Sequence, residues 1–208
     1  MSRPRKIPSQ QRSRFTYEVI LQAAARVFDA EGMAATTNRI AERAGVSVGS
    51  LYQYFPDKQA LLHELASRHL DHAETAFADA LDRIRTTRPA LETVVAELVT
   101  LAARENAPFA KAHQVMREHT PRTRDIERRF RRLVDLVVDG LVDYLDPPPR
   151  LREETRLRVR LIVAGLDSQI HQIVLDGTSA EERAARTRLV IEQTVPVIRG
   201  DRDVPARG

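Results

Sequence analysis

The sequence predicts an all-α fold of about nine helices, with a small three-helix domain near the N-terminus and a larger helical domain after it. Apolar residues recur at helical spacing through most of the chain. Proline and glycine gather between these periodic segments, where helices end and the chain turns. Because no segment shows the alternating, β-branched pattern of a strand, helices alone account for the periodicity.

The first helix is expected over residues 14–31, where apolar residues form one continuous stripe. Two short helices follow, over about residues 37–44 and 47–54. Thr37 is the expected N-cap of the first, and Ser47 is the expected N-cap of the second. Three closely spaced helices of this kind predict a compact N-terminal domain.

Prolines mark the corners of the rest of the chain, since each either stops a helix or lies just inside the start of the next. A long helix is expected from about Lys58 to Arg85, and a short one after Ala107-Pro108. The remaining helices are expected over about residues 89–105, 122–145, 151–176 and 180–199. Residues 200–208 are expected to be a disordered tail.

The composition excludes several classes of protein. The 208 residues include no cysteine, which removes disulfides, thiolate zinc sites and cysteine nucleophiles together. No apolar run approaches the roughly 20 residues that span a bilayer, and no signal-peptide pattern begins the chain. We therefore expect a soluble, cytoplasmic protein with no membrane partner.

Positive charge is concentrated at the N-terminus. Residues 1–14 carry five basic residues and no acidic one, so the rest of the chain sums to −1 of the net charge of +4. We interpret residues 1–13 as a flexible basic arm that contacts phosphates, with a merely solubilising tail as the alternative.

Residues 37–55 have the spacing of a helix-turn-helix motif, with Gly45 at the tight turn. Five apolar residues are assigned to packing between the helices: Ile40, Ala41, Val46, Leu51 and Phe55. The opposite face of the second helix is short, uncharged and rich in hydroxyl groups, and it consists of Ser47, Val48, Gly49, Ser50, Tyr52, Gln53 and Tyr54. Such a face suits the major groove of DNA, because small residues let the backbone approach and polar ones reach base edges or phosphates.

The stretch from Phe15 to Leu65, above all IAERAGVSVGSLYQYFPDKQALL, resembles the DNA-binding domain of the tetracycline-repressor (TetR) family. The resemblance covers about a quarter of the chain, and the remainder is similar only in helix number, helix length and proline placement. It implies a helix-turn-helix domain over residues 14–57 and a helical ligand-sensing and dimerisation domain over residues 58–199.

The resemblance also implies roles for single residues. Thr37, Tyr52 and Lys58 would hold DNA phosphates, although a helix cap, a core tyrosine and an ordinary surface lysine are the alternatives. Asn38, Val48, Gly49 and Ser50 would face the groove, with Gln53 and Tyr54 beside them, and Arg3, Arg5 and Lys6 would add contacts from the arm. Because the recognition helix has no Arg or Lys, DNA shape and van der Waals contact should contribute more than paired hydrogen bonds to guanine.

For the larger domain, the resemblance implies a homodimer through the last two helices and a cavity for a small molecule between the others. Intrachain burial explains the same apolar stripes, so the pattern alone leaves the dimer open. Polar residues within the otherwise apolar central helices are candidates for ligand binding, with surface exposure or a satisfied core hydrogen bond as the alternative: Asn106, His113, Gln114, Arg117, Gln169 and His171.

We therefore expect a ligand-responsive transcription regulator, namely a repressor that binds a palindromic operator as a dimer and is released by a small molecule. An activator or partner-controlled regulator on the same fold, or a non-specific DNA-binding protein, is the alternative. The histidine pairs His69/His72 and His113/His119 lack the spacing of a zinc-binding HExxH motif, and no nucleophile motif appears. We expect no catalytic residue, metal or cofactor.

Overall fold

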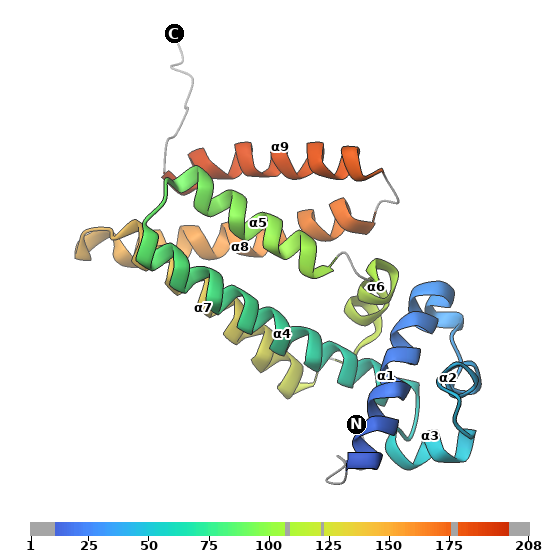
Figure 1. The fold of residues 1–208 in the computed structure, drawn as a ribbon. Helices are drawn as coiled ribbons and strands as arrows, with labels where there is room; N and C mark the ends of the chain where they lie inside the picture. The colour runs from blue at the N-terminus through green and yellow to red at the C-terminus, as the bar shows by residue number, and fades with distance from the viewer. Residues whose placement is uncertain (1–10, 107–108, 122, 176–178, 200–208) are drawn as a thin grey trace. The chain divides into compact units, whose positions relative to one another are not determined.

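The computed structural model describes residues 11–106, 109–121, 123–175 and 179–199 (Figure 1). Across these ranges the chain forms nine α-helices and two short 3-10 turns, and it contains no strand. The predicted all-α fold and the predicted number of helices are therefore confirmed. The basic arm and the C-terminal tail lie outside the described residues.

The helices agree with the predicted ranges to within three residues at each end. They are α1 (Gln11–Glu31), α2 (Thr37–Ala44), α3 (Val48–Tyr54), α4 (Lys58–Thr87), α5 (Leu91–Asn106), α6 (Ala110–His119), α7 (Arg124–Leu145), α8 (Arg152–Leu175) and α9 (Ala180–Arg199), with 3-10 turns at Gly32–Ala34 and Pro149–Leu151. No described helix is long and apolar enough to cross a membrane.

The chain divides into two compact units. The first consists of Met1–Asp71 and Pro108–Phe130, and the second consists of His72–Ala107 and Arg131–Gly208. Helices α4 and α7 each contribute residues to both units. The boundary that we predict between residues 57 and 58 separates the DNA-binding domain from the ligand-sensing and dimerisation domain. This boundary stays a prediction.

The core of the first unit forms around the apolar stripe of α1. Ile20, Ala24 and Phe28 have no exposed surface, and residues of α2, α3 and α4 pack around them. Helix α6 closes the same core with Ala112, Val115 and Met116. Burying apolar surface from five helices in this way stabilises α2 and α3, which are too short to be stable alone.

Asp29 of α1 caps helix α6 from outside it. Its Oδ1 atom accepts hydrogen bonds from the backbone N–H groups of Lys111 (3.1 Å) and Ala112 (3.3 Å). The preceding residue, Phe109, offers no side-chain cap. A carboxylate at this position satisfies donors that the first turn of a helix leaves unpaired and opposes the positive end of the helix dipole.

The second unit contains two apolar clusters. One lies between α4, α5, α7 and α8, and the other lies between α5, α8 and α9. Gly140 of α7 allows a close approach to α4, because an added Cβ atom would lie only 2.6 Å from Cδ2 of Leu81. Along α7, which matches the helix expected over residues 122–145, Val137 and Leu141 are buried, whereas Phe130 keeps 45% of its surface exposed.

Candidate DNA-binding site

Helices α2 and α3 form the predicted helix-turn-helix. Gly45 ends α2 in the left-handed region (φ +66°), and its N–H donates to the carbonyl groups of Ala41 and Glu42. Ser47 caps α3 as predicted, because its Oγ accepts a hydrogen bond from the backbone N–H of Ser50 (3.0 Å). The turn therefore has the glycine and the serine where the backbone requires them.

The predicted N-cap of α2 is wrong by one residue. Thr36, in an extended conformation, accepts a hydrogen bond from the N–H of Arg39 (3.2 Å), and Thr37 is the first helical residue. Two adjacent threonines are chemically equivalent as caps, so the sequence could not decide between them. Because Thr36 caps the helix, the hydroxyl of Thr37 is available for another partner.

The packing residues of the motif lie where the spacing predicts. Ile40, Ala41, Leu51 and Phe55 have no exposed surface, and Val46 is partly buried against the same cluster. Leu51 and Phe55 anchor α3 on one side, so its other side is turned away from the core. The recognition helix therefore lies on a fixed apolar base.

The residues that we predict to contact DNA differ in exposure. Asn38, Ser47, Gly49 and Gln53 are exposed, and Tyr52 keeps 40% of its surface. Thr37 and Ser50 are half-buried, while Val48 and Tyr54 are partly buried against the core. The predicted contact residues on α2 and α3 are thus uncharged, and each keeps at least part of its surface exposed. Arg3, Arg5 and Lys6 lie outside the described residues.

The two predicted phosphate-binding hydroxyls lie together. Thr37 Oγ1 and Tyr52 Oη are 3.1 Å apart and form a hydrogen bond between α2 and α3. A hydroxyl pair uses only one of its two hydrogens, so one O–H group remains able to donate to a phosphate oxygen. Helix α2 therefore supplies one hydroxyl of this hydrogen-bonded pair, and α3 supplies the other.

Tyr54, which we placed beside the groove-facing residues, has an additional role in packing. Its hydroxyl lies 3.0 Å from Ser13 Oγ at the start of α1, and its ring meets the Tyr17 ring edge-on, with centroids 6.0 Å apart. Sequence reasoning did not single out Ser13, because no local pattern relates two residues that are 41 positions apart.

Lys58, the third predicted phosphate contact, supports the turn that leads into α2. Its Nζ donates to the carbonyl oxygens of Met33 (2.8 Å) and Ala35 (3.2 Å). An ammonium group has three N–H donors, so these two hydrogen bonds leave one N–H for a further acceptor. A structural role of Lys58 and a contact with phosphate are thus compatible.

Positive charge on α2 is partly neutralised by neighbouring carboxylates. Arg39 pairs with Glu31 (3.4 Å) and with Glu42 (2.8 Å). The hydrogen bond to Glu31 and the charge of Glu42 hold the pKa of Arg39 above its ordinary value. Arg43 is exposed one turn further along the helix.

The residues that we predict to bind a ligand belong to both units. Asn106 is buried and donates to the carbonyl of Ala102 (2.8 Å), and His171 Nδ1 donates to the carbonyl of Asp167 (2.7 Å). His113 packs edge-on against His69, with ring centroids 4.2 Å apart. The other three candidates, Gln114, Arg117 and Gln169, are exposed.

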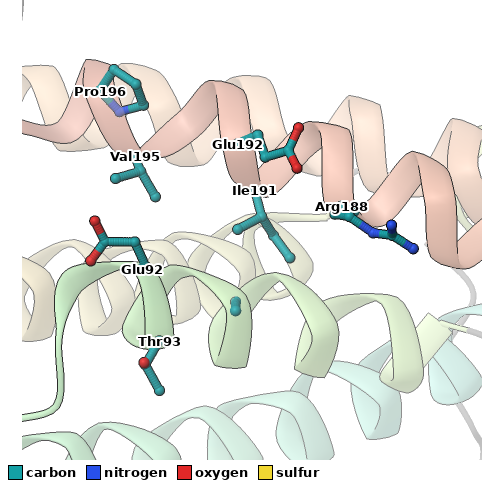
Figure 2. Close-up of a pocket in the computed structure, with 8 residues that line it drawn as sticks. Glu92, Thr93, Arg188, Ile191, Glu192, Val195 and Pro196 are labelled. Carbon is teal, nitrogen blue, oxygen red and sulfur yellow. The ribbon is translucent and has the colours of Figure 1, made fainter.

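An open groove between α5 and α9 is lined by other residues (Figure 2). Its floor includes Ile191 and Val195, which extend from α9 toward α5 in Figure 2. Four charged or polar residues and the apolar Ala96 and Pro196 complete the lining, and the full set is Glu92, Thr93, Ala96, Arg188, Ile191, Glu192, Val195 and Pro196. None of the six predicted ligand-binding residues lines this groove.

Helices α8 and α9 expose apolar side chains in the second unit. Leu157 and Leu161 of α8 keep 59% and 66% of their surface, and Leu189 and Val197 of α9 keep 56% and 52%. Ala164 and Gly165 on α8 and Ala185 on α9 are exposed as well. Both helices therefore carry apolar side chains that the described part of the chain leaves exposed.

Residues 20–65 match the model of the bacterial regulatory proteins of the tetR family. This range contains the whole helix-turn-helix and the first turns of α4. Over this range the chain is similar to the TetR family. That family consists of bacterial regulatory proteins, in agreement with the DNA-binding regulator that the sequence predicts from these residues.

Curated relatives match the same end of the chain. The HTH-type transcriptional repressor KstR2 of Mycolicibacterium smegmatis is 40% identical over 76 residues, which is 36% of this chain and 36% of that protein. KstR2 of Mycobacterium tuberculosis is 39% identical over 64 residues, or 30% of this chain and 32% of the relative. The chain thus spans about a third of the length of the curated relatives it matches.

Solved structures are similar in fold over most of this chain. FadR, the fatty acid degradation regulator of Bacillus halodurans, has a TM-score of 0.61 at 20% identity and covers 92% of this chain, with 97% of its own chain covered. FadR of Bacillus subtilis in complex with stearoyl-CoA has a TM-score of 0.60 at 19% identity, with 86% and 97% covered. At this identity the likeness shows the fold alone.

Proposed function

We propose that this protein is a ligand-responsive transcriptional repressor that binds a palindromic operator as a homodimer. The observation that supports DNA recognition most directly is the uncharged outer face of α3, held on the buried base of Leu51 and Phe55. A short helix with one face anchored and the other face small and polar can enter the major groove.

In this proposal α3 reads the groove, with Gly49 at the closest backbone approach and with Gln53 and Asn38 at base edges. The recognition helix contains no Arg or Lys, so DNA shape and thymine methyl groups contribute more than bidentate contacts to guanine. The Thr37–Tyr52 hydroxyl pair donates to one phosphate, and Lys58 donates its remaining N–H to another.

The dimer forms through α8 and α9. Leu157 and Leu161 would be covered by the second copy, and Gly165 allows the helices to approach closely. Exposed apolar area of this kind on two neighbouring helices is typical of a subunit interface. Leu161→Glu would place a charge in the interface, and we expect the mass in solution to fall from dimer to monomer. The matched control is Leu151→Glu, on an exposed leucine before α8.

The regulator is proposed to release its operator when a small molecule binds the helical domain. The related fold of Bacillus subtilis FadR was solved with stearoyl-CoA, which supports a ligand site in such a domain without assigning that ligand to this chain. The ligand would bind one state of the dimer more tightly than the other and so shift their populations. We propose that the protein acts in the cytoplasm.

The experiment that tests the proposal is binding of the purified full chain to its own upstream intergenic DNA, compared with scrambled DNA, across a salt series. We expect a dimer that prefers its own upstream sequence, and a preference that persists as salt rises. Asn38→Ala and Gln53→Ala should lower this preference without altering the affinity for scrambled DNA. Equal affinity for both duplexes, lost as salt rises, would contradict the proposal and favour non-specific binding.

The sign of regulation needs a separate readout. A reporter gene under the upstream sequence should be expressed more strongly when the gene for this protein is deleted. Lower expression after deletion would instead make the protein an activator on the same fold.

A further inference from the structure

We infer that Tyr17 and Arg68 are positioning residues that set the orientation of the recognition helix α3 relative to α4. The inference rests on the proposed DNA-binding function, because the orientation of α3 matters through the groove that it enters. All of the residues involved belong to the first unit.

Arg68 joins α4 to α1 through a fork of hydrogen bonds. Its Nη1 and Nη2 atoms donate to the two carboxylate oxygens of Glu18 on α1, and its Nε donates to Glu64 (3.0 Å) on α4. A guanidinium held at both its fork and its Nε has a fixed plane. The pKa of Glu18 is held below its ordinary value mainly by the hydrogen bond from Arg68.

The plane of Arg68 in turn fixes the ring of Tyr17. Its guanidinium carbon lies 5.3 Å from the centre of that ring, within the range of a cation–π contact. Tyr17 is 4% exposed, and burial together with the negative charge of Glu64 raises the pKa of its hydroxyl. The Arg68 guanidinium of α4, whose plane is fixed, therefore holds the Tyr17 ring in place.

The same ring holds the C-terminal end of the recognition helix. Phe55, which caps α3, stacks on Tyr17 with ring centroids 4.9 Å apart and planes at 29°. Tyr54, the last residue of α3, meets Tyr17 edge-on at 6.0 Å, and its hydroxyl bonds to Ser13 of α1. Since α3 has only seven residues, two aromatic contacts at one end decide its direction.

The ion pair between Arg68 and Glu18 is exposed enough that its effect on the orientation of α3 can be distinguished from its effect on stability. The side chains of Arg68 and Glu18 are 41% and 46% exposed, and pairs exposed to this extent contribute little to the free energy of unfolding. Loss of the Arg68 fork should therefore change the geometry of α3 more than the stability of the unit. DNA affinity and unfolding should respond differently.

The test compares Arg68→Ala and Tyr17→Leu with Arg129→Ala. Arg129 is a matched control, because its ion pairs to Asp71 of α4 and Asp125 of α7 lie within the same unit and involve neither Tyr17 nor Glu18. For Arg68→Ala we expect affinity for the upstream DNA to fall about tenfold or more, with an unchanged affinity for scrambled DNA. The urea midpoint should stay close to that of Arg129→Ala. Arg68→Lys, which keeps the charge but not the fork, should restore little of the affinity.

A spectroscopic readout separates this inference from the DNA-binding proposal. The chain has four tyrosines, so 3-fluorotyrosine labelling gives four fluorine resonances, and Tyr54→Phe assigns the one from Tyr54 at the end of α3. Arg68→Ala should shift the Tyr54 resonance of the free protein, and Arg129→Ala should not. An unshifted Tyr54 resonance, or an affinity loss equal in Arg68→Ala and Arg129→Ala, would overturn the inference. If the wild-type protein fails to prefer its own upstream DNA, the proposed function fails while the resonance still tests the positioning.

Discussion

Gly49 tests whether the outer face of α3 enters DNA, because its substitution by alanine should change stability and affinity in opposite directions. Gly49 is exposed within a regular helix, and an added Cβ atom would meet only Ser47 Oγ, at 3.8 Å. This is ordinary van der Waals contact, so the free protein has room for the methyl group. Only a bound partner could exclude it.

The two effects have separate magnitudes. Alanine in place of glycine within a helix raises the free energy of unfolding by roughly 0.5–1 kcal/mol. If DNA packs against this backbone, an extra methyl group costs about 1–3 kcal/mol of binding, since well-packed contacts tolerate added volume poorly. That cost corresponds to a loss of affinity of roughly 5- to 150-fold. Gly49→Ala should therefore be a more stable protein that binds its operator more weakly.

Gly45→Ala should have the opposite effect on stability and should leave DNA affinity unchanged. Gly45 has φ +66°, where an L-residue costs about 1–2 kcal/mol, yet no atom lies within 4 Å of its added Cβ. Its stability should fall, and its affinity should be retained well below the unfolding transition. Urea unfolding and fluorescence anisotropy with labelled upstream DNA measure the two quantities for each variant. Wild-type operator affinity in a stabilised Gly49→Ala protein would refute the groove-facing assignment of α3.

Three further changes have defined outcomes. Gly140→Ala should lower the free energy of unfolding by about 1–2 kcal/mol in urea, because its Cβ would lie 2.6 Å from Leu81 and the helix gain offsets only part of the clash. Asp29→Ala should cost about 0.5–2 kcal/mol and speed amide exchange at the start of α6, whereas Asp29→Asn keeps a capping oxygen. The pKa of Glu18 is lowered below 4.5 in the folded state, so its contribution is present above that pH and lost as pH falls through the folded pKa. Since the side chains of this ion pair are nearly half exposed, Glu18→Gln should flatten that acid limb of the thermal stability curve only slightly.

Local chemistry explains why most of the helix-turn-helix could be predicted. Gly45 is required by a positive φ, Ser47 by an N-cap, and Leu51 and Phe55 by helical spacing on one face. Each of these requirements acts over a few residues, so the sequence displays it directly. The Thr36 and Thr37 ambiguity has the same origin, because a local rule satisfied by two neighbours cannot choose between them.

Contacts between distant segments could not be predicted in this way. The bonds from Ser13 to Tyr54, from Lys58 to Met33 and from Arg68 to Glu18 join residues that no periodicity relates. They depend on how helices pack after they have formed. The candidate ligand residues show the same limit, since polarity within an apolar helix indicates a buried hydrogen bond as readily as a ligand contact.

The first unit also shows that a sequence motif can cover fewer residues than the folded unit that contains it. The family match ends at residue 65, whereas the core around α1 is completed by Ala112, Val115 and Met116 of α6. Asp29 adds a cap that α6 cannot supply for itself. A motif records the residues that recur together along the chain, but a core is closed by whichever helix covers its remaining apolar face. The DNA-binding helices of this protein are therefore supported by a segment more than 40 residues beyond their motif, and a change in α6 acts on α1 through shared packing.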